Sequence, residues 1–277
     1  MTTAVVEVTE PGIHDGMPDE VYHRDPVPAG SLSSSGARRL LKTCPAKFDY
    51  ERRNPPAPTK TFDIGHAAHQ MILGTGPELV VVPGARWDTN DAKAQVAAVR
   101  ERGGIPLKQA DMDQIRAMAD AILADPLAAA MLSVGEPERS LFWVDERTGI
   151  WRRARLDWYR DGHIVDLKTC ESADEEAIRR DAARYGYHAQ DEWYREGVRA
   201  VGLCPDPSFT FIFVEKAAPH LTHVVQLGPD EIAAGRHLNN KAIDRFAECQ
   251  RTGVWPGYAS DITTISLPPY ALRALEF

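Results

Sequence analysis

The sequence of 277 residues lacks any run approaching the roughly 18 to 20 consecutive apolar residues that a transmembrane helix needs. Its first ten residues also lack the cationic and then apolar layout of a secretory signal. With 43% hydrophobic and 26% charged residues, the composition is that of a globular protein with a sizeable core. We therefore expect a cytoplasmic protein with no membrane segment.

Cysteine is scarce, and its four copies are far apart, at Cys44, Cys170, Cys204 and Cys249. They form no CxxC pair, so the spacing suggests neither a zinc ribbon nor a disulfide framework. We expect reduced thiols.

Positive charge is in the minority, with 32 Lys and Arg against 40 Asp and Glu and a formal net charge of −8. This balance argues against a protein coated in basic charge for binding nucleic acid. The segment from Gly36 to Lys60 is an exception, because its seven basic residues outnumber two acidic ones. The sequence therefore allows a confined basic surface on an acidic protein.

Sequence patterns divide the chain into an arm and one domain. Residues 1–30 are rich in proline and glycine and predict an irregular arm, whereas residues 31–277 predict a single domain. Within that domain, residues 31–134 carry helical patterns and residues 135–277 an α/β pattern. In the helical part we expect helices at about 37–44, 46–53, Thr61 or Asp63 to Leu73, 91–102 and 111–132 with an interruption at Pro126, and a short strand at 79–82.

The second half begins with β-branched and aromatic residues from Glu138 to Thr169, which predict three antiparallel strands with turns at 146–149 and 161–162. Ser172 and Glu175 form a capping-box pattern for a helix that pauses near Gly186 and resumes to about Val201. Two more strands, at 209–215 and 222–226, and a long helix at 229–251 complete an α/β outline.

Asp161-Gly162 is a strong hairpin signal, because this dipeptide favours a two-residue type I′ turn. With Arg160 opposite His163, the same register places Asp157 opposite Asp166 and Arg155 opposite Lys168. Alternation along the strands then gives two faces. One carries Arg155, Asp157, Tyr159, Ile164, Asp166 and Lys168, and the other carries the apolar side chains of Leu156, Trp158, Val165 and Leu167.

Two directly opposed carboxylates repel each other unless a positive charge lies between them. A divalent cation with oxygen ligands, of the kind that also meets phosphate, would stabilise Asp157 and Asp166. Lys168 lies on the same face and can reach a substrate phosphate or an attacking water. The alternative is a solvent-facing strand surface in which these carboxylates pair with Arg155 and Lys168.

Asp157, nine residues before Asp166-Leu-Lys168, resembles the core of the PD-(D/E)XK nuclease superfamily. Gly65-His-Ala-Ala-His69 resembles the GxxxH motif of its branch containing RecB-type nuclease domains and phage exonucleases, and Gln190-Asp-Glu-Trp-Tyr194 resembles its QxxxY motif. A spacing of four places each motif pair on one helix face. The segments 33–50, 214–216 and 253–258 extend the similarity to the RecE-like (exonuclease VIII-like) phage and prophage nucleases.

This resemblance implies a restriction-endonuclease-like α/β core, with a central mixed β-sheet flanked by helices and a helical N-terminal half. It implies that His69, Asp157, Asp166 and the backbone carbonyl of Leu167 hold the metal. His66 is a rival to His69, but the GxxxH spacing favours His69.

The same resemblance implies a catalytic set made of Asp157, Asp166, Lys168, Gln190 and Tyr194. Lys168 corresponds to the catalytic lysine, and Gln190 and Tyr194 would orient the site or the DNA end. The implied cofactor is Mg²⁺ or Mn²⁺. Some relatives hold an iron–sulfur cluster through one upstream cysteine and a downstream trio; the trio is missing, so no cluster is expected and Cys44 is expected to be a buried residue at a helix end.

The implied activity is hydrolysis of linear double-stranded DNA, 5′ to 3′, which leaves 3′ single-stranded tails for recombination. The implied partners are a RecT-like annealing protein and further copies of the chain in a ring. Candidate DNA-binding residues are Arg38, Arg39, Lys42, Arg52 and Arg53 of the basic segment and Arg152, Arg153 and Arg155 near the hairpin. For each of them the alternative is a solvated helix or strand face.

Three other functions are open. One is a RecB-like repair nuclease that acts on single strands or as an endonuclease. Another is a DNA-end-binding protein with a degenerate nuclease core, which an intact set of Asp157, Asp166 and Lys168 disfavours. The third is a metal-dependent enzyme with a non-nucleic substrate.

Overall fold

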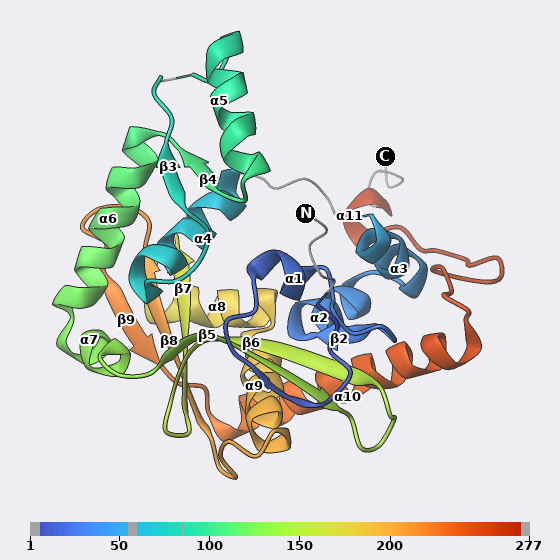
Figure 1. Ribbon diagram of the computed structural model, residues 1–277. Helices are drawn as coiled ribbons and strands as arrows, with labels where there is room; N and C mark the ends of the chain where they lie inside the picture. The colour runs from blue at the N-terminus through green and yellow to red at the C-terminus, as the bar shows by residue number, and fades with distance from the viewer. Residues whose placement is uncertain (1–5, 55–59, 85, 273–277) are drawn as a thin grey trace.

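A mixed β-sheet of seven strands forms the centre of the protein, with helices on both of its faces (Figure 1). The computed structural model describes residues 6–54, 60–84 and 86–272. The strands are β1 (Gly12–His14), β2 (Ser31–Ser33), β5 (Glu136–Val144), β6 (Trp151–Arg160), β7 (His163–Cys170), β8 (Ser208–Glu215) and β9 (Thr222–Val225), and a separate pair is formed by β3 (Leu79–Val81) and β4 (Ile105–Leu107).

The helices cover the sheet and form the lobe at the upper left of Figure 1. They are α1 (Asp19–His23), α2 (Ser34–Lys42), α3 (Pro45–Arg53), α4 (Lys60–Leu73), α5 (Asn90–Glu101), α6 (Gln109–Ala124), α7 (Pro126–Leu132), α8 (Glu175–Tyr185), α9 (Tyr187–Ala200), α10 (Pro229–Thr252) and α11 (Pro269–Leu272). In the described ranges, no helix combines the length and the apolar character that crossing a bilayer requires.

The sheet follows the order β1-β5-β6-β7-β8-β9, and β2 pairs in parallel with β6. β7 and β8 are parallel, because the chain crosses over through α8 and α9 between them, and the other pairs along the main path are antiparallel. The expected α/β fold with a central mixed sheet and flanking helices is therefore confirmed.

Two apolar clusters lie on opposite faces of the sheet. One packs α2, α9 and α10 against the phenylalanines of β8, and the other packs α4, α6 and α7 against Val165, Leu167 and Ile212. The prediction that one face of the hairpin is apolar and the other polar is wrong in this respect. Tyr159 and Ile164, which share the supposedly polar face, are buried in the first cluster, because helices cover both sides of the sheet.

The hairpin of β6 and β7 turns at Asp161-Gly162, as predicted, and both turn residues have positive φ. Its backbone ladder joins Arg160 to His163, Tyr159 to Ile164 and Trp158 to Val165 and ends there. In the described strands, no backbone pair joins Asp157 to Asp166 or Arg155 to Lys168. The strands separate at the acidic residues, which leaves room for side-chain chemistry between them.

Several local predictions need correction. The segment expected to be an irregular arm contains β1 and α1, and β1 extends the sheet by pairing with β5. The short strands β2 and β4 were not predicted. The cap of α8 is Asp174, whose carboxylate accepts a hydrogen bond from Ala177 N at 2.9 Å, and Ser172 instead donates to Asp174.

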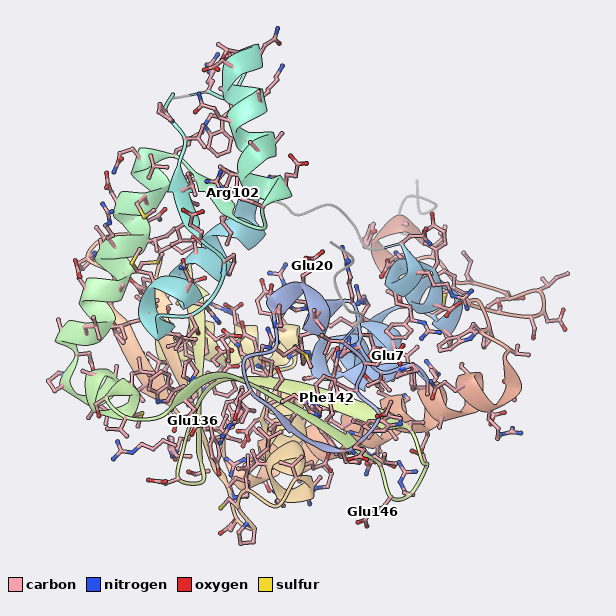
Figure 2. All side chains as sticks on the ribbon, in the orientation of Figure 1. Glu7, Glu20, Arg102, Glu136, Phe142 and Glu146 are labelled. Carbon is pink, nitrogen blue, oxygen red and sulfur yellow. The ribbon has the colours of Figure 1, made fainter. Side chains whose placement is uncertain are left out.

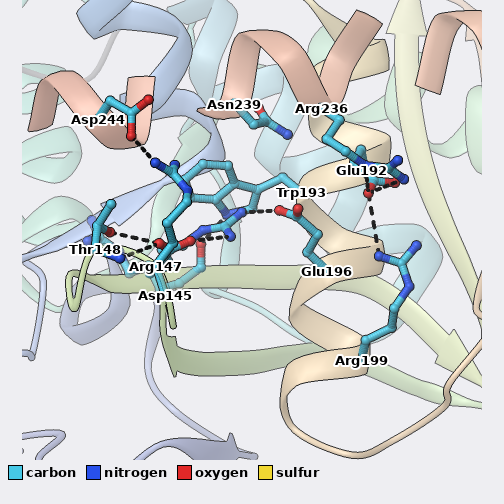
Figure 3. Close-up of polar contacts among 12 residues, drawn as sticks. Asp145, Arg147, Thr148, Glu192, Trp193, Glu196, Arg199, Arg236, Asn239 and Asp244 are labelled. Carbon is cyan, nitrogen blue, oxygen red and sulfur yellow. Dashed lines mark hydrogen bonds and ion pairs between the residues drawn. The ribbon is translucent and has the colours of Figure 1, made fainter. Parts of the chain in front are cut away.

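Helix α9 packs between the sheet and α10, and ion pairs connect these elements (Figure 3). Glu192 is fully buried and accepts hydrogen bonds from Arg199 at 3.4 Å and from Arg236 of α10 at 2.9 Å. Arg147, in the loop between β5 and β6, pairs with Asp244 of α10. Because α9 carries the QxxxY motif, these contacts fix the place of that motif beside the sheet.

Candidate active site

Three side chains from different elements converge near the point where β6 and β7 separate. They are His69 of α4, Glu138 of β5 and Asp157 of β6, and one ligand atom of each lies within 4.8 Å of the others. Two carboxylates and an imidazole within that distance match the donors that divalent metals take in proteins. His69 and Asp157 were predicted as metal ligands, and Glu138 was not.

The register of β5 and β6 brings Glu138 to Asp157. Arg139 pairs with Leu156 and Pro137 with Trp158, so Glu138 stands opposite Asp157 although no ladder pair forms there. Glu138 has φ +51°, a left-handed conformation that is uncommon for a residue other than glycine. A hairpin centred on the predicted turn at 146–149 would have placed these two acids opposite each other. The left-handed backbone conformation of Glu138, by contrast, has no signal in the sequence.

His69 and Asp157 both contact the backbone of Leu167. The His69 Nε2 group lies 3.0 Å from the carbonyl oxygen of Leu167 and donates to it, and the Leu167 N–H donates to Asp157 Oδ2 at 2.8 Å. With Nε2 occupied in this way, His69 Nδ1 faces Asp157 Oδ2 at 3.4 Å. The predicted ligands His69, Asp157 and the Leu167 carbonyl are therefore adjacent. The side chain of His66, the rival ligand, lies outside the described residues.

Asp166, the residue before Leu167 on β7, is fully buried. Its Oδ1 accepts a hydrogen bond from Gln190 Nε2 at 2.5 Å, and its Oδ2 pairs with Lys168. The Lys168 ammonium group also lies 5.2 Å from the centre of the Tyr187 ring. The structure thus brings Asp166, Lys168 and Gln190 together, while the group of possible metal ligands in the described residues contains Asp157 and not Asp166.

Two carboxyl groups of the site, those of Glu138 and Asp166, have raised pKa values. Burial, reinforced by the charge of Asp157, raises the pKa of Glu138 to about 8. Burial also raises the pKa of Asp166 to about 6, although the charge of Lys168 opposes the shift. Both pKa values are raised although Arg155 lies near Glu138 and Lys168 pairs with Asp166. Strongly shifted carboxyl groups of this kind are characteristic of metal and catalytic sites.

Arg38 contacts Gln190, and Tyr194 lies one turn further along α9. The Arg38 guanidinium donates to the Gly186 carbonyl at 3.2 Å and to Gln190 Oε1 at 3.4 Å. Burial raises the pKa of Tyr194 well above its ordinary value, and the charges of Asp166 and Asp157 contribute, so this phenol is neutral near the carboxylates. Arg38, Gln190, Asp166 and Lys168 form a continuous chain of hydrogen bonds from α2 to β7.

Three of the predicted DNA-binding residues have internal partners instead. Arg152 is buried between Trp143 and Trp193 and pairs with Asp145 at 3.3 Å and with Glu196. Arg153 donates to Ser31 and pairs with Asp25 at 3.0 Å, and Arg155 pairs with Asp19 at 3.2 Å. Their guanidinium groups are buried and engaged by acids of the same chain, which disfavours contact of these three residues with DNA.

The other basic candidates lie on α2 and α3, beside the end of α8. Arg39 and Arg53 are exposed, and their ion pairs with Glu51 at 3.8 Å and Asp49 at 2.8 Å lie at the surface. Lys42 donates to the Arg184 carbonyl at 2.5 Å. Arg52 is held by Asp49 and by the Trp255 ring, 4.7 Å from its guanidinium carbon. Cys44 is buried at the N-cap of α3, as predicted.

The fold and this acidic and basic constellation define the class of PD-(D/E)XK-like domains. The chain belongs to the family described as PDDEXK-like domain of unknown function (DUF3799), which matches residues 33–268. No curated protein matches the sequence.

A solved structure with a TM-score above 0.5 agrees with this fold. A proposed exonuclease from Eubacterium rectale superposes with a TM-score of 0.62 at 15% identity, covering 92% of this chain and 96% of its own. A phage-related exonuclease from Haemophilus somnus 129PT has a TM-score of 0.35 at 12% identity, covering 81% of this chain and 96% of its own. The family and the fold together support a nuclease.

Proposed function

We propose that the protein is a metal-dependent exonuclease that hydrolyses linear double-stranded DNA from 5′ to 3′ and leaves 3′ single-stranded tails for recombination by strand annealing. The observation that supports it most is the convergence of His69, Glu138 and Asp157 beside the Asp166–Lys168 pair. The direction, the ring of several copies and a RecT-like partner follow from the resemblance and belong to the proposal.

The donor set fits Mg²⁺ or Mn²⁺, which His69, Glu138 and Asp157 would hold, with Asp166 and the Leu167 carbonyl as further ligands. A bound divalent cation would lower the pKa of a water molecule and polarise the scissile phosphoryl group. Lys168 is placed to offset negative charge that develops on the phosphate in the transition state. Gln190 holds Asp166 in place and would orient the DNA end together with Tyr194. Arg38 places a positive charge next to Gln190 and near Tyr194.

A single digestion experiment tests the proposal. Linear duplex DNA labelled at the 5′ or the 3′ end, single-stranded DNA and circular duplex are incubated with Mg²⁺, Mn²⁺, Ca²⁺ or EDTA. We expect Mg²⁺-dependent loss of linear duplex from its 5′ ends. Cleavage of circles or preference for single strands would favour a RecB-like nuclease instead, and end binding without cleavage would favour a non-catalytic DNA-end-binding protein.

The same assay tests the residues. Asp166→Asn and Lys168→Ala are expected to lower the rate by roughly 100-fold or more, because each removes a charge that acts in the transition state. Circular dichroism should show an intact fold. Lys241→Ala, which removes an exposed lysine of α10, is the matched control and should cleave like the wild type. Undiminished cleavage by either site variant would contradict the assignment.

A further inference from the structure

The N-terminal segment 12–23 contacts β5 and β6 close to Glu138. β1 pairs with β5 at residues 140–142, two positions beyond Glu138. The Asp15 carboxylate then accepts two hydrogen bonds of 3.0 Å from Arg139, the neighbour of Glu138. Two polar contacts of this kind form a rigid, planar pair. The segment therefore fixes the strand that carries the strained Glu138 backbone.

The same segment also contacts Arg155 of β6, which lies near Glu138 of the neighbouring strand β5. Arg155 Nη1 pairs with Asp19 Oδ1 at 3.2 Å, and Nη2 donates to the Met17 carbonyl at 2.8 Å. The Tyr22 ring covers this guanidinium, with 4.3 Å from the guanidinium carbon to the ring centre. Asp19 Oδ1 also lies 3.1 Å from His23 Nε2. The Arg155 side chain is 8% exposed, whereas the Asp19 side chain is 39% exposed, so the ion pair lies at the edge of the buried region.

Arg155 contacts Glu138 much less closely. Its Nε group donates to Ser140 Oγ at 3.0 Å and lies 3.9 Å from Glu138 Oε2, beyond hydrogen-bond distance. A guanidinium that formed a direct bidentate pair with Glu138 would compete with a metal for the same oxygens. The hydrogen bonds from Arg155 to residues 17 and 19 keep it from doing so.

We propose that the N-terminal segment is a positioning element of the metal site. Asp19 and the Met17 carbonyl retain Arg155, so that the Glu138 carboxylate stays turned toward His69 and Asp157. This inference rests on the proposed function, because it requires a divalent metal at those three residues. Asp19 acts through Arg155 and is thus a positioning residue that need not touch metal or DNA.

Calorimetric titration of metal-free protein with Mn²⁺ at pH 8 tests the proposal. Asp19→Asn should bind Mn²⁺ about tenfold more weakly than the wild type, as expected when a contact behind a metal ligand is lost. Glu20→Gln is the matched control, because Glu20 is on the same helix (Figure 2) and pairs with the exposed Arg24. This control should bind Mn²⁺ like the wild type.

A double variant separates positioning from general destabilisation. If Asp19→Asn acts by releasing Arg155 onto Glu138, then Asp19→Asn/Arg155→Met should recover most of the Mn²⁺ affinity. Unchanged affinity in Asp19→Asn, or no recovery in a folded double variant, would overturn the inference.

Should the double variant fail to fold, the single variants decide. Weaker Mn²⁺ binding by Asp19→Asn, with its metal-free thermal midpoint equal to that of Glu20→Gln, supports the inference. Equal Mn²⁺ affinity overturns it while leaving the proposed function in place. Absence of Mn²⁺ binding by the wild-type protein would instead overturn the metal site itself.

Discussion

The conformation and surroundings of Glu138 lower the stability of the metal-free fold but suit a residue that binds a cation. It is a partly buried acid in a left-handed backbone conformation, next to Asp157 and within reach of His69. Each of these features is unfavourable for an isolated folded chain. They become intelligible if the carboxylate serves a cation, because a bound cation stabilises the ionised form.

The raised pKa of Glu138 predicts a pH dependence of stability in metal-free protein. The folded-state pKa of Glu138, about 8, lies above the unfolded value near 4.5. The contribution of Glu138 to the free energy of unfolding is therefore fully present below pH 4.5 and is lost as the pH rises through 8. The pKa of Asp166 is about 6, so its own contribution to the free energy of unfolding changes little above that pH. Between pH 6 and 8 the wild type should therefore lose on the order of 1 kcal/mol that Glu138→Gln retains.

Urea unfolding in EDTA at pH 6 and pH 8 measures this difference. Glu138→Gln should be the more stable protein at pH 8, and the gap should narrow at pH 6. Mn²⁺ should stabilise the wild type more than the variant. A gap that does not depend on pH would show that Glu138 does not titrate in this range.

At the scale of elements, α9 is the helix on which the site depends most. It presents Gln190 to Asp166 while its other sides pack on the sheet and on α10. Glycines permit both contacts: Gly197 lies against the Trp143 ring, and a Cβ atom at Gly235 of α10 would overlap the His188 carbonyl oxygen of α9. Asn239 of α10 also donates to the Ala189 carbonyl at 2.9 Å.

The close approach of α10 to α9 predicts that Gly235→Ala is destabilising by roughly 1 to 3 kcal/mol, the usual cost of overpacking. The added methyl group meets backbone atoms of α9, so the helices must move apart and shift Gln190 away from Asp166. Denaturant unfolding and the nuclease rate measure the two effects. Gly257→Ala, where nothing lies within 4 Å of the added methyl, should change neither. Wild-type stability in Gly235→Ala would refute this packing argument.

At the scale of the whole molecule, the charge distribution reconciles an acidic protein with a DNA substrate. The net charge of −8 coexists with exposed Arg39 and Arg53 on α2 and α3. The arginines of β6, by contrast, connect the sheet to the N-terminal segment and to α9. The proposed DNA surface is therefore smaller than the sequence suggested and centred on α2 and α3.

This surface predicts a salt dependence. If Arg39 and Arg53 each contact a phosphate, replacing both by alanine should weaken duplex binding and reduce the slope of log K against log salt by about 2. Fluorescence anisotropy at several salt concentrations, with Ca²⁺ in place of Mg²⁺, gives the slope. Arg251→Ala, an exposed arginine at the end of α10 that pairs with Glu248, is the control. An unchanged slope in the double variant would exclude Arg39 and Arg53 from contact with the DNA phosphates.

The sequence by itself determined the features that depend on neighbouring residues. Asp161-Gly162 fixed the hairpin turn, and the periodic segments fixed most helices, because turn chemistry and helix periodicity act over a few positions. The four motifs led to the fold and to five residues that the structure brings together. His69 and Asp157 contact the Leu167 backbone, and Lys168 and Gln190 contact the neighbouring Asp166.

Only the tertiary structure decided which charged side chains are free to bind a metal ion or DNA. Glu138 joined the site through its cross-strand position and a strained φ angle, and Arg152, Arg153 and Arg155 left the proposed DNA surface because acids distant in sequence engage them. The N-terminal segment became part of the sheet for the same reason. Burial and ion pairing are set by residues brought together from across the chain, and no local pattern specifies them.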